Sequence, residues 1–126
     1  MKMTKRTDFE NIGSMISHCD AMLSDISAMN GDIDGFLENG TIQRSCAYSL
    51  LMMGERAKHV SDETRLAYPG IGWKTLISVG ELIGHSFNMI DPRMVWDMIT
   101  NDIPAIRGDL LSVKNEVESA RLSQPA

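Results

Sequence analysis

The chain has 126 residues and a net charge of −5, with 43% hydrophobic and 23% charged residues. These values are typical of one globular domain with a buried core, and they exclude a disordered chain. The apolar runs are shorter than the roughly 20 residues that span a bilayer, and the basic start MKMTKRTDFE lacks the apolar stretch of a secretory signal. We therefore expect a cytoplasmic domain over residues 1–122 with a frayed tail over 123–126, no membrane association, and no broad affinity for nucleic acid.

The first third of the chain predicts one long amphipathic helix. Its apolar residues recur three and four positions apart, which places them on one helical face: Ile12, Met15, Ile16, Cys19, Met22, Leu23, Ile26 and Met29. Asn30-Gly31 is a typical helix stop. The following stretch, DIDGFLENG, predicts a single helical turn that places Phe36 and Leu37 on the core.

The remaining elements are also helical. Thr41 is the expected N-cap of a second long helix, whose apolar stripe runs from Ile42 to Val60. Ser61 is expected to cap a brief turn before the loop 68–72, and a third helix is expected over Trp73–Phe87.

Asp91-Pro92 has the form of an N-cap followed by a first-turn proline, which predicts a fourth helix. Pro104 breaks or restarts the pattern before a final helix with an apolar stripe from Ile106 to Val117. The alternation typical of β-strands is missing from the sequence. The predicted fold is all-α, an up-down bundle of four to five helices.

The two cysteines, Cys19 and Cys46, fall on apolar stripes and are expected to be buried free thiols. The ten methionines are expected mainly in the core. His18, Cys19 and Asp20 are adjacent metal-capable residues, but neighbours on a helix point about 100° apart and do not share one ion. No metal and no cofactor is expected.

Phosphate loops, nucleophile elbows, zinc helices and calcium loops are all missing from the sequence. One histidine, His85 in the stretch VGELIGHSF, is prominent because it lies at the end of a predicted helix between Gly84 and Ser86. Small residues there allow a ligand or another chain to approach closely. From the residues alone, a structural histidine remains the simpler interpretation.

An ordered set of short motifs extends from residue 43 to residue 104: Gln43-Arg44, Gly54-Glu55, Ala57-Lys58, Pro69, Ile71-Gly72-Trp73-Lys74, Val95-Trp96 and Asn101-Asp102-Ile103-Pro104. In order and spacing this set resembles the HepT-like group of the HEPN superfamily. That group contains ribonuclease toxins paired with MNT nucleotidyltransferase antitoxins. The resemblance implies a HEPN-like helical fold, a homodimer, an antitoxin of that nucleotidyltransferase class as partner, and metal-independent cleavage of RNA in a cleft shared by two chains.

The resemblance also assigns the site. The family motif is an arginine, usually followed by asparagine, with a histidine five positions after the arginine and often a tyrosine two further on. Counted from Trp73, these positions are Gly80, Glu81, His85 and Phe87, so the chain keeps only the histidine. The resemblance thus makes His85 the catalytic residue of a degenerate motif. Lys74 and Ser86 are expected to bind substrate.

Cleavage through a 2′-hydroxyl needs a base, which a histidine suits, and a cation for the charge developing on phosphorus, which a guanidinium suits. Gly80 supplies no charge and Glu81 would repel the phosphate; losing one preorganised donor alone costs roughly 10²–10³ in rate. We therefore expect impaired catalysis and a function in binding a nucleotidyltransferase, RNA or nucleotide.

Two alternatives remain open. The first is an active endoribonuclease toxin that uses His85 with a relocated cation, for which Lys74, Arg93 and Arg44 are the candidates. The second is a plain helical interaction protein without a nucleic-acid or nucleotide ligand. A purely structural interpretation of the two residues is also open, in which Gly80 permits close packing at a dimer interface and His85 forms a hydrogen bond across it.

Overall fold

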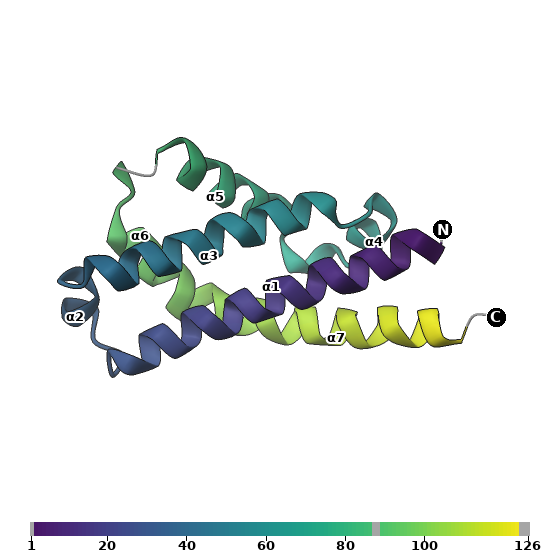
Figure 1. Cartoon of the computed structure of the whole chain (residues 1–126), viewed down its shortest axis with the longest axis horizontal. Coiled ribbons are helices and arrows are strands. Elements are labelled where there is room, and N and C mark those ends of the chain that lie inside the picture. The colour runs from purple at the N-terminus through teal and green to yellow at the C-terminus, as the bar shows by residue number, and fades with distance from the viewer. Residues whose placement is uncertain (1, 87–88, 124–126) are drawn as a thin grey trace.

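The computed structural model describes residues 2–86 and 89–123, and these are almost entirely helical, which confirms the all-α prediction. The long helices are α1 (Lys2–Ala28), α3 (Gly40–His59), α5 (Trp73–His85) and α7 (Ile103–Leu122). They run alternately up and down, with α5 packed on α3, α3 on α1, and α1 on α7 (Figure 1). Both ends of the chain lie at one end of this bundle (Figure 1). No helix of the described part is long and apolar enough to cross a lipid bilayer.

The predicted helix stops and caps are largely confirmed. Asn30 and Gly31 have positive φ angles of 53° and 69° and end the turn after α1. The short helix α2 (Ile33–Leu37) buries Phe36 completely, and its ring lies 5.3 Å from that of Trp96. Ser61 caps α4 (Asp62–Ala67) by accepting a hydrogen bond from the Thr64 N–H.

The prediction that Thr41 caps the second long helix is wrong. Helix α3 begins two residues earlier, at Gly40, because the Asn39 side chain accepts a hydrogen bond from the Ile42 N–H at 3.0 Å. The Thr41 hydroxyl instead accepts a hydrogen bond from Arg44 at 3.4 Å. An asparagine offers the same capping oxygen as a threonine, and the intervening Gly40 fits the first helical position.

The C-terminal third is one helical run rather than two separate helices. Asp91 caps α6 (Pro92–Asp97), as predicted, and the chain continues through a π-helical turn, η3 (Met98–Asp102), into α7. Pro104 has no N–H to donate to a carbonyl four residues earlier, and a wider turn just before it accommodates that loss. The helical run therefore continues through Pro104.

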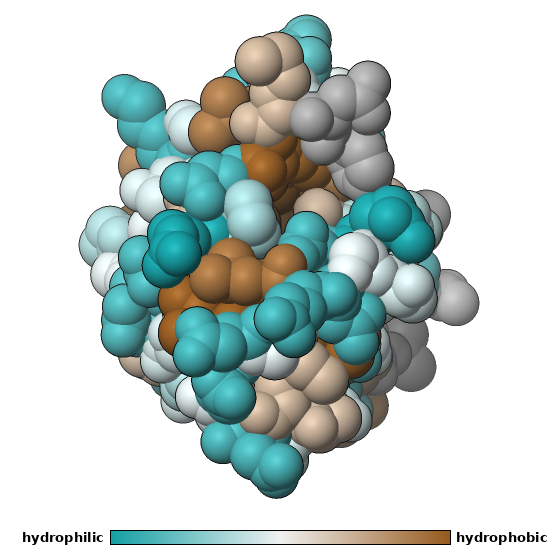
Figure 2. All heavy atoms as spheres, turned by 90° about the vertical axis from the view of Figure 1, so that its left-hand side faces the viewer, coloured by the Kyte–Doolittle hydropathy of each residue, from teal (hydrophilic) through white to brown (hydrophobic). Residues whose placement is uncertain are grey.

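The core lies between the long helices and includes the two thiols. Cys19 and Cys46 are buried and free, as predicted, and Met15, Met22 and Met53 are fully buried among them. Methionine is therefore core filler at these positions, although Met89 is 86% exposed. At the end of the bundle that carries α2 and α6, apolar surface appears in separate areas between hydrophilic side chains (Figure 2).

A buried carboxylate joins the start of α1 to α4. Asp8 is 1% exposed and accepts hydrogen bonds from the Ser61 N–H, the Ser61 hydroxyl and the Thr64 hydroxyl. Trp73 fixes the next junction, because its indole N–H donates to the Tyr68 carbonyl at 3.0 Å, across the short helix η1 (Pro69–Ile71). These bonds set where α5 starts and how it lies on α3.

Candidate functional site

Helix α5 carries the residues that the sequence singled out. It starts after Gly72, which has a φ of 72°, and ends at His85, with Ser86 as the C-cap whose N–H donates to the Leu82 carbonyl. The expected end at Phe87 lies outside the described residues, and the helix stops two residues before it. Trp73, Leu76 and Ile83 are buried, so one face of α5 is fixed on the core.

Gly80, which the resemblance places at the arginine position of the motif, is buried where α5 packs on α3. A Cβ atom on Gly80 would lie 3.0 Å from the Gly54 Cα and 3.3 Å from the Leu51 carbonyl oxygen. A Cβ on Gly54 would lie only 2.8 Å from the Leu76 carbonyl oxygen. The two helices approach this closely because both positions lack a side chain. Gly80 thus permits close packing between two helices of one chain. The structural interpretation that placed this packing at a dimer interface is wrong in this respect.

His85 is exposed and lines a cavity of about 260 Å³ between α3 and α5. The charged residues that line the same cavity are Glu55, Lys58 and Glu81. The structure therefore brings together two of the predicted site residues, His85 and Glu81, together with Gly80. It adds a cation from α3 that the sequence had not suggested for catalysis.

That cation is held by two carboxylates. The Lys58 Nζ lies 3.0 Å from a Glu55 oxygen and 3.4 Å from a Glu81 oxygen. The hydrogen bond to Glu55, and more weakly that to Glu81, raises the pKa of Lys58 above its ordinary value. The lysine stays charged, but its charge is already balanced. Counting these three residues alone, the cavity carries one excess negative charge.

Only half of this arrangement had a signal in the sequence. Glu55 and Lys58 are three residues apart on one helix and are expected to face each other. Glu81 reaches Lys58 from another helix, and that pairing depends on how closely α3 and α5 pack. In the sequence, Lys58 appeared only in one of the short motifs that carry the resemblance, and not among the candidate site residues.

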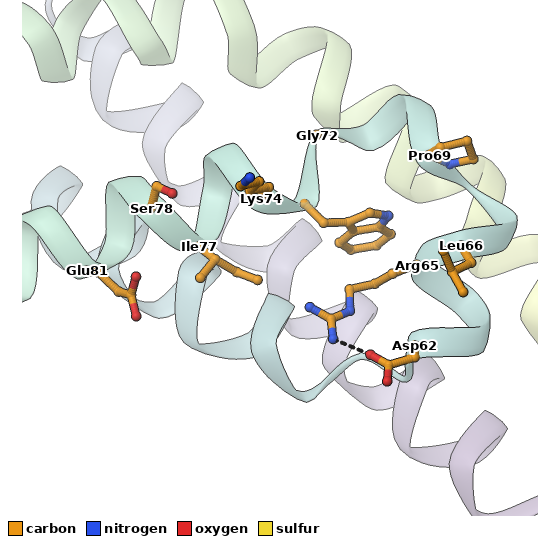
Figure 3. Close-up of a pocket in the computed structure, with 10 residues that line it drawn as sticks. Asp62, Arg65, Leu66, Pro69, Gly72, Lys74, Ile77, Ser78 and Glu81 are labelled. Carbon is orange, nitrogen blue, oxygen red and sulfur yellow. Dashed lines mark hydrogen bonds and ion pairs between the residues drawn. The ribbon is translucent and has the colours of Figure 1, made fainter.

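Lys74, a predicted substrate contact, lies elsewhere. It is in the first turn of α5, eleven residues before His85, which is about 16 Å along a helix. It lines a larger groove of about 710 Å³ formed by α4, η1 and α5 (Figure 3). In that groove Arg65 pairs with Asp62 at 2.6 Å, while Glu81 lies at the far end, where the two hollows meet (Figure 3).

The remaining candidates are more scattered. Ser86 directly follows His85 and is half-buried. Arg44 lines a small hollow with Pro92 near the other end of α3 and does not line the His85 cavity; neither does Arg93. Phe87, which the resemblance places at the tyrosine position, lies outside the described residues. Among the described residues, no three His, Cys, Asp or Glu side chains form a group that could hold a metal ion.

Comparison with known proteins agrees with the resemblance seen in the motifs. Residues 16–113 match the family model described as Ribonuclease HepT-like. The protein "Putative RNase MJ1380" of Methanocaldococcus jannaschii is 24% identical over 89 residues, covering 69% of this chain and 82% of that protein. The "Probable ribonuclease HepT" of Thermococcus cleftensis is 22% identical over 108 residues, covering 86% and 94% of the two chains. No solved structure matches the chain.

Proposed function

Because the chain belongs to the ribonuclease HepT-like family of HEPN proteins, we propose that it is a catalytically impaired member. It acts by binding a nucleotidyltransferase, RNA or nucleotide, and it does not cleave RNA. The observation that carries this proposal is the charge of the His85 cavity. Its lysine, Lys58, is held by Glu55 and Glu81, and the arginine position is a buried glycine. The names of the relatives, which are those of ribonucleases, support the RNA-related part of the proposal.

The chemistry explains why this arrangement is a poor ribonuclease. An exposed imidazole such as that of His85 suits the removal of a proton from a 2′-hydroxyl. The phosphorus that is attacked then gathers negative charge, and a preorganised cation must stabilise it. Lys58 is already paired, and Glu81 adds a repulsive charge beside it. The base is retained, whereas the stabilisation of the transition state is lost.

The proposed active form is a homodimer, and the proposed partner is a nucleotidyltransferase of the class paired with this family. Exposed apolar surface on α5 supports an interface there, since Leu82 is 52% exposed and lies three residues before His85. Analytical ultracentrifugation at micromolar concentration tests the dimer. A monomer at that concentration would contradict it.

A metal-free assay on mixed RNA tests the loss of catalysis. We expect the unaltered chain to cut no faster than His85→Ala. We also expect Glu81→Asn, which removes the repulsive charge, to bind a fluorescent oligoribonucleotide several-fold more tightly. Glu63→Asn is the matched control, because it removes an equal charge from an exposed position on α4, away from the cavity. Equal effects of the two substitutions would show that only net charge matters and would remove the support for this cavity.

One observation favours a second function, that of an active endoribonuclease. Lys58 and His85 line the same cavity, so Lys58 is a better placed replacement cation than Lys74, Arg93 or Arg44. In that case the unaltered chain would cleave RNA without metal, and both His85→Ala and Lys58→Gln would abolish the cleavage. This result would contradict the proposal of impaired catalysis.

A further inference from the structure

A second polar cavity lies on another face of α3, away from His85. Its volume is about 550 Å³, and it lies between the N-terminal half of α1 and the C-terminal end of α3, two helices that run side by side (Figure 1). All the residues that line it are polar: Thr7, Glu10, Asn11, Ser14, Arg56 and His59. Its α3 residues lie about a third of a turn round the helix from those of the His85 cavity.

Arg56 is the unusual residue of this cavity. Its Nε atom is buried and has no hydrogen-bond partner, and within the described residues its guanidinium forms no ion pair. Arg65 and Arg107 differ, because each pairs with an aspartate. Because no carboxylate of the described residues pairs with Arg56, an anion in the cavity is the ligand that suits the charge of this guanidinium.

The positive charge of Arg56 affects the neighbouring His18 side chain. Burial lowers the pKa of the neighbouring His18, and the positive charge of Arg56 lowers it further. The ring of His18 in turn packs edge-on against Tyr48, 6.1 Å between centroids. Glu10 also lines the cavity, where its carboxylate reduces the positive potential.

Hydrogen-bond donors complete the site. Ser14 is half-buried and lines the cavity, so its hydroxyl can donate a hydrogen bond to a ligand there. The Asn11 side chain donates to the His59 carbonyl at 3.4 Å and fixes the end of α3 beside α1. The imidazole of His59 is exposed on the rim of the cavity.

We propose that this cavity binds a phosphate group, with Arg56 as the charge partner and with Ser14 and His59 as further donors. A guanidinium offers two parallel N–H donors to two phosphate oxygens, and donors on a second helix suit the remaining oxygens of a tetrahedral anion. The phosphate is either that of an RNA backbone or a free phosphate. The site does not depend on His85 or on the proposed loss of catalysis.

Titration of the full chain with inorganic phosphate, followed by NMR of the three histidine rings, tests the site. We expect the His18 and His59 signals to shift with millimolar phosphate while the His85 signal stays in place. The pKa of His18 should rise on binding, because the anion offsets the charge of Arg56. Shifts of equal size at all three histidines, or none at His18 and His59, would overturn the proposal.

A charge-matched pair of variants identifies the residue responsible. Arg56→Gln should weaken phosphate binding about tenfold or more, the effect of losing a charge-assisted hydrogen bond. Arg107→Gln removes an equal charge from α7, where this arginine pairs with Asp20 outside the cavity, and should leave phosphate binding unchanged. Equal weakening by both variants would overturn the site. If Arg56→Gln fails to fold, the histidine titration of the unaltered chain still decides.

A competition experiment distinguishes an RNA backbone from a free phosphate as the ligand. A short oligoribonucleotide that shifts the same two histidine signals and displaces phosphate identifies an RNA backbone as the ligand. If only inorganic phosphate shifts them, the ligand is a free phosphate. Both results support the site, and they differ only in what occupies it.

Discussion

The contact between α3 and α5 makes a quantitative prediction about two glycines. Replacing Gly54 with alanine should destabilise the chain, because the added Cβ would lie 2.8 Å from the Leu76 carbonyl oxygen and 3.0 Å from the Gly80 Cα. Both are backbone atoms, which cannot rotate away as a flexible side chain does. Relief therefore requires the two helices to move apart.

The magnitude follows from two opposing effects. Alanine is favoured over glycine inside a helix by about 1 kcal/mol, and overpacking a tight contact costs about 1–3 kcal/mol. Because the obstacle is backbone, the upper end of that range applies, and the free energy of unfolding should fall by about 2 kcal/mol, or about 8 °C in Tm.

Gly108 provides the matched control. It lies within α7 and is exposed, and an added Cβ would have no heavy atom within 4 Å apart from its chain neighbours and the nearby backbone of its own helix. Only the helix-propensity effect operates there, so Gly108→Ala should stabilise the chain by about 1 kcal/mol. Thermal and urea unfolding followed by circular dichroism measure both variants. If Gly54→Ala were stabilised as much as Gly108→Ala, the close packing of α3 on α5, and the explanation of the buried Gly80, would be refuted.

Two further predictions concern buried groups. Asp8→Ala should lower the free energy of unfolding by about 3 kcal/mol in urea titrations, because the donors that meet this buried carboxylate lose their acceptor; an unchanged midpoint would contradict that role. Burial raises the pKa of both the Cys19 and Cys46 thiols from 9.0 to about 12, so both should react with a thiol reagent at pH 8 only after unfolding. A thiol pKa raised by folding favours the folded state below pH 9, and this contribution is lost as the pH rises from about 9 toward 12; fast native labelling at pH 8 would refute the burial.

The helices were predictable because their signals are local. Apolar spacing placed α1 and α3, and the Ser61 and Asp91 caps were found because a capping residue acts on N–H groups two or three positions away. The Asn39 cap was missed in favour of Thr41, since both residue types serve and spacing alone does not separate them. The π-helical turn before Pro104 was not predictable. The same sequence pattern fits a proline at the start of a new helix and a proline that follows a widened turn in a continuous helix.

The candidate site was only partly predictable. His85 and Glu81 are on one helix, and motif spacing found both. Lys58 reaches Glu81 across the α3–α5 contact, and no local pattern gives the distance between two helices. The cavity around Arg56 was missed for the same reason, since the residues that α1 and α3 contribute to it are more than forty positions apart in the chain.

The two departures from the motif, at the positions that the resemblance assigns, are physically connected. With glycine at position 80, α5 packs against Gly54, and this approach brings Glu81 within 3.4 Å of Lys58. Removing the Glu81 charge therefore leaves Lys58 paired with Glu55 and supplies no guanidinium, whereas an arginine at position 80 must first push the helices apart. Catalysis should not return with either change alone, and the double variant Gly80→Arg, Glu81→Asn should cut only if the separated helices leave room for both cations around a phosphate. Cleavage by the single Glu81→Asn variant would show that Lys58 is a sufficient cation for RNA cleavage. The cause of the impaired catalysis would then be the Glu81 carboxylate and not the close packing of α3 on α5.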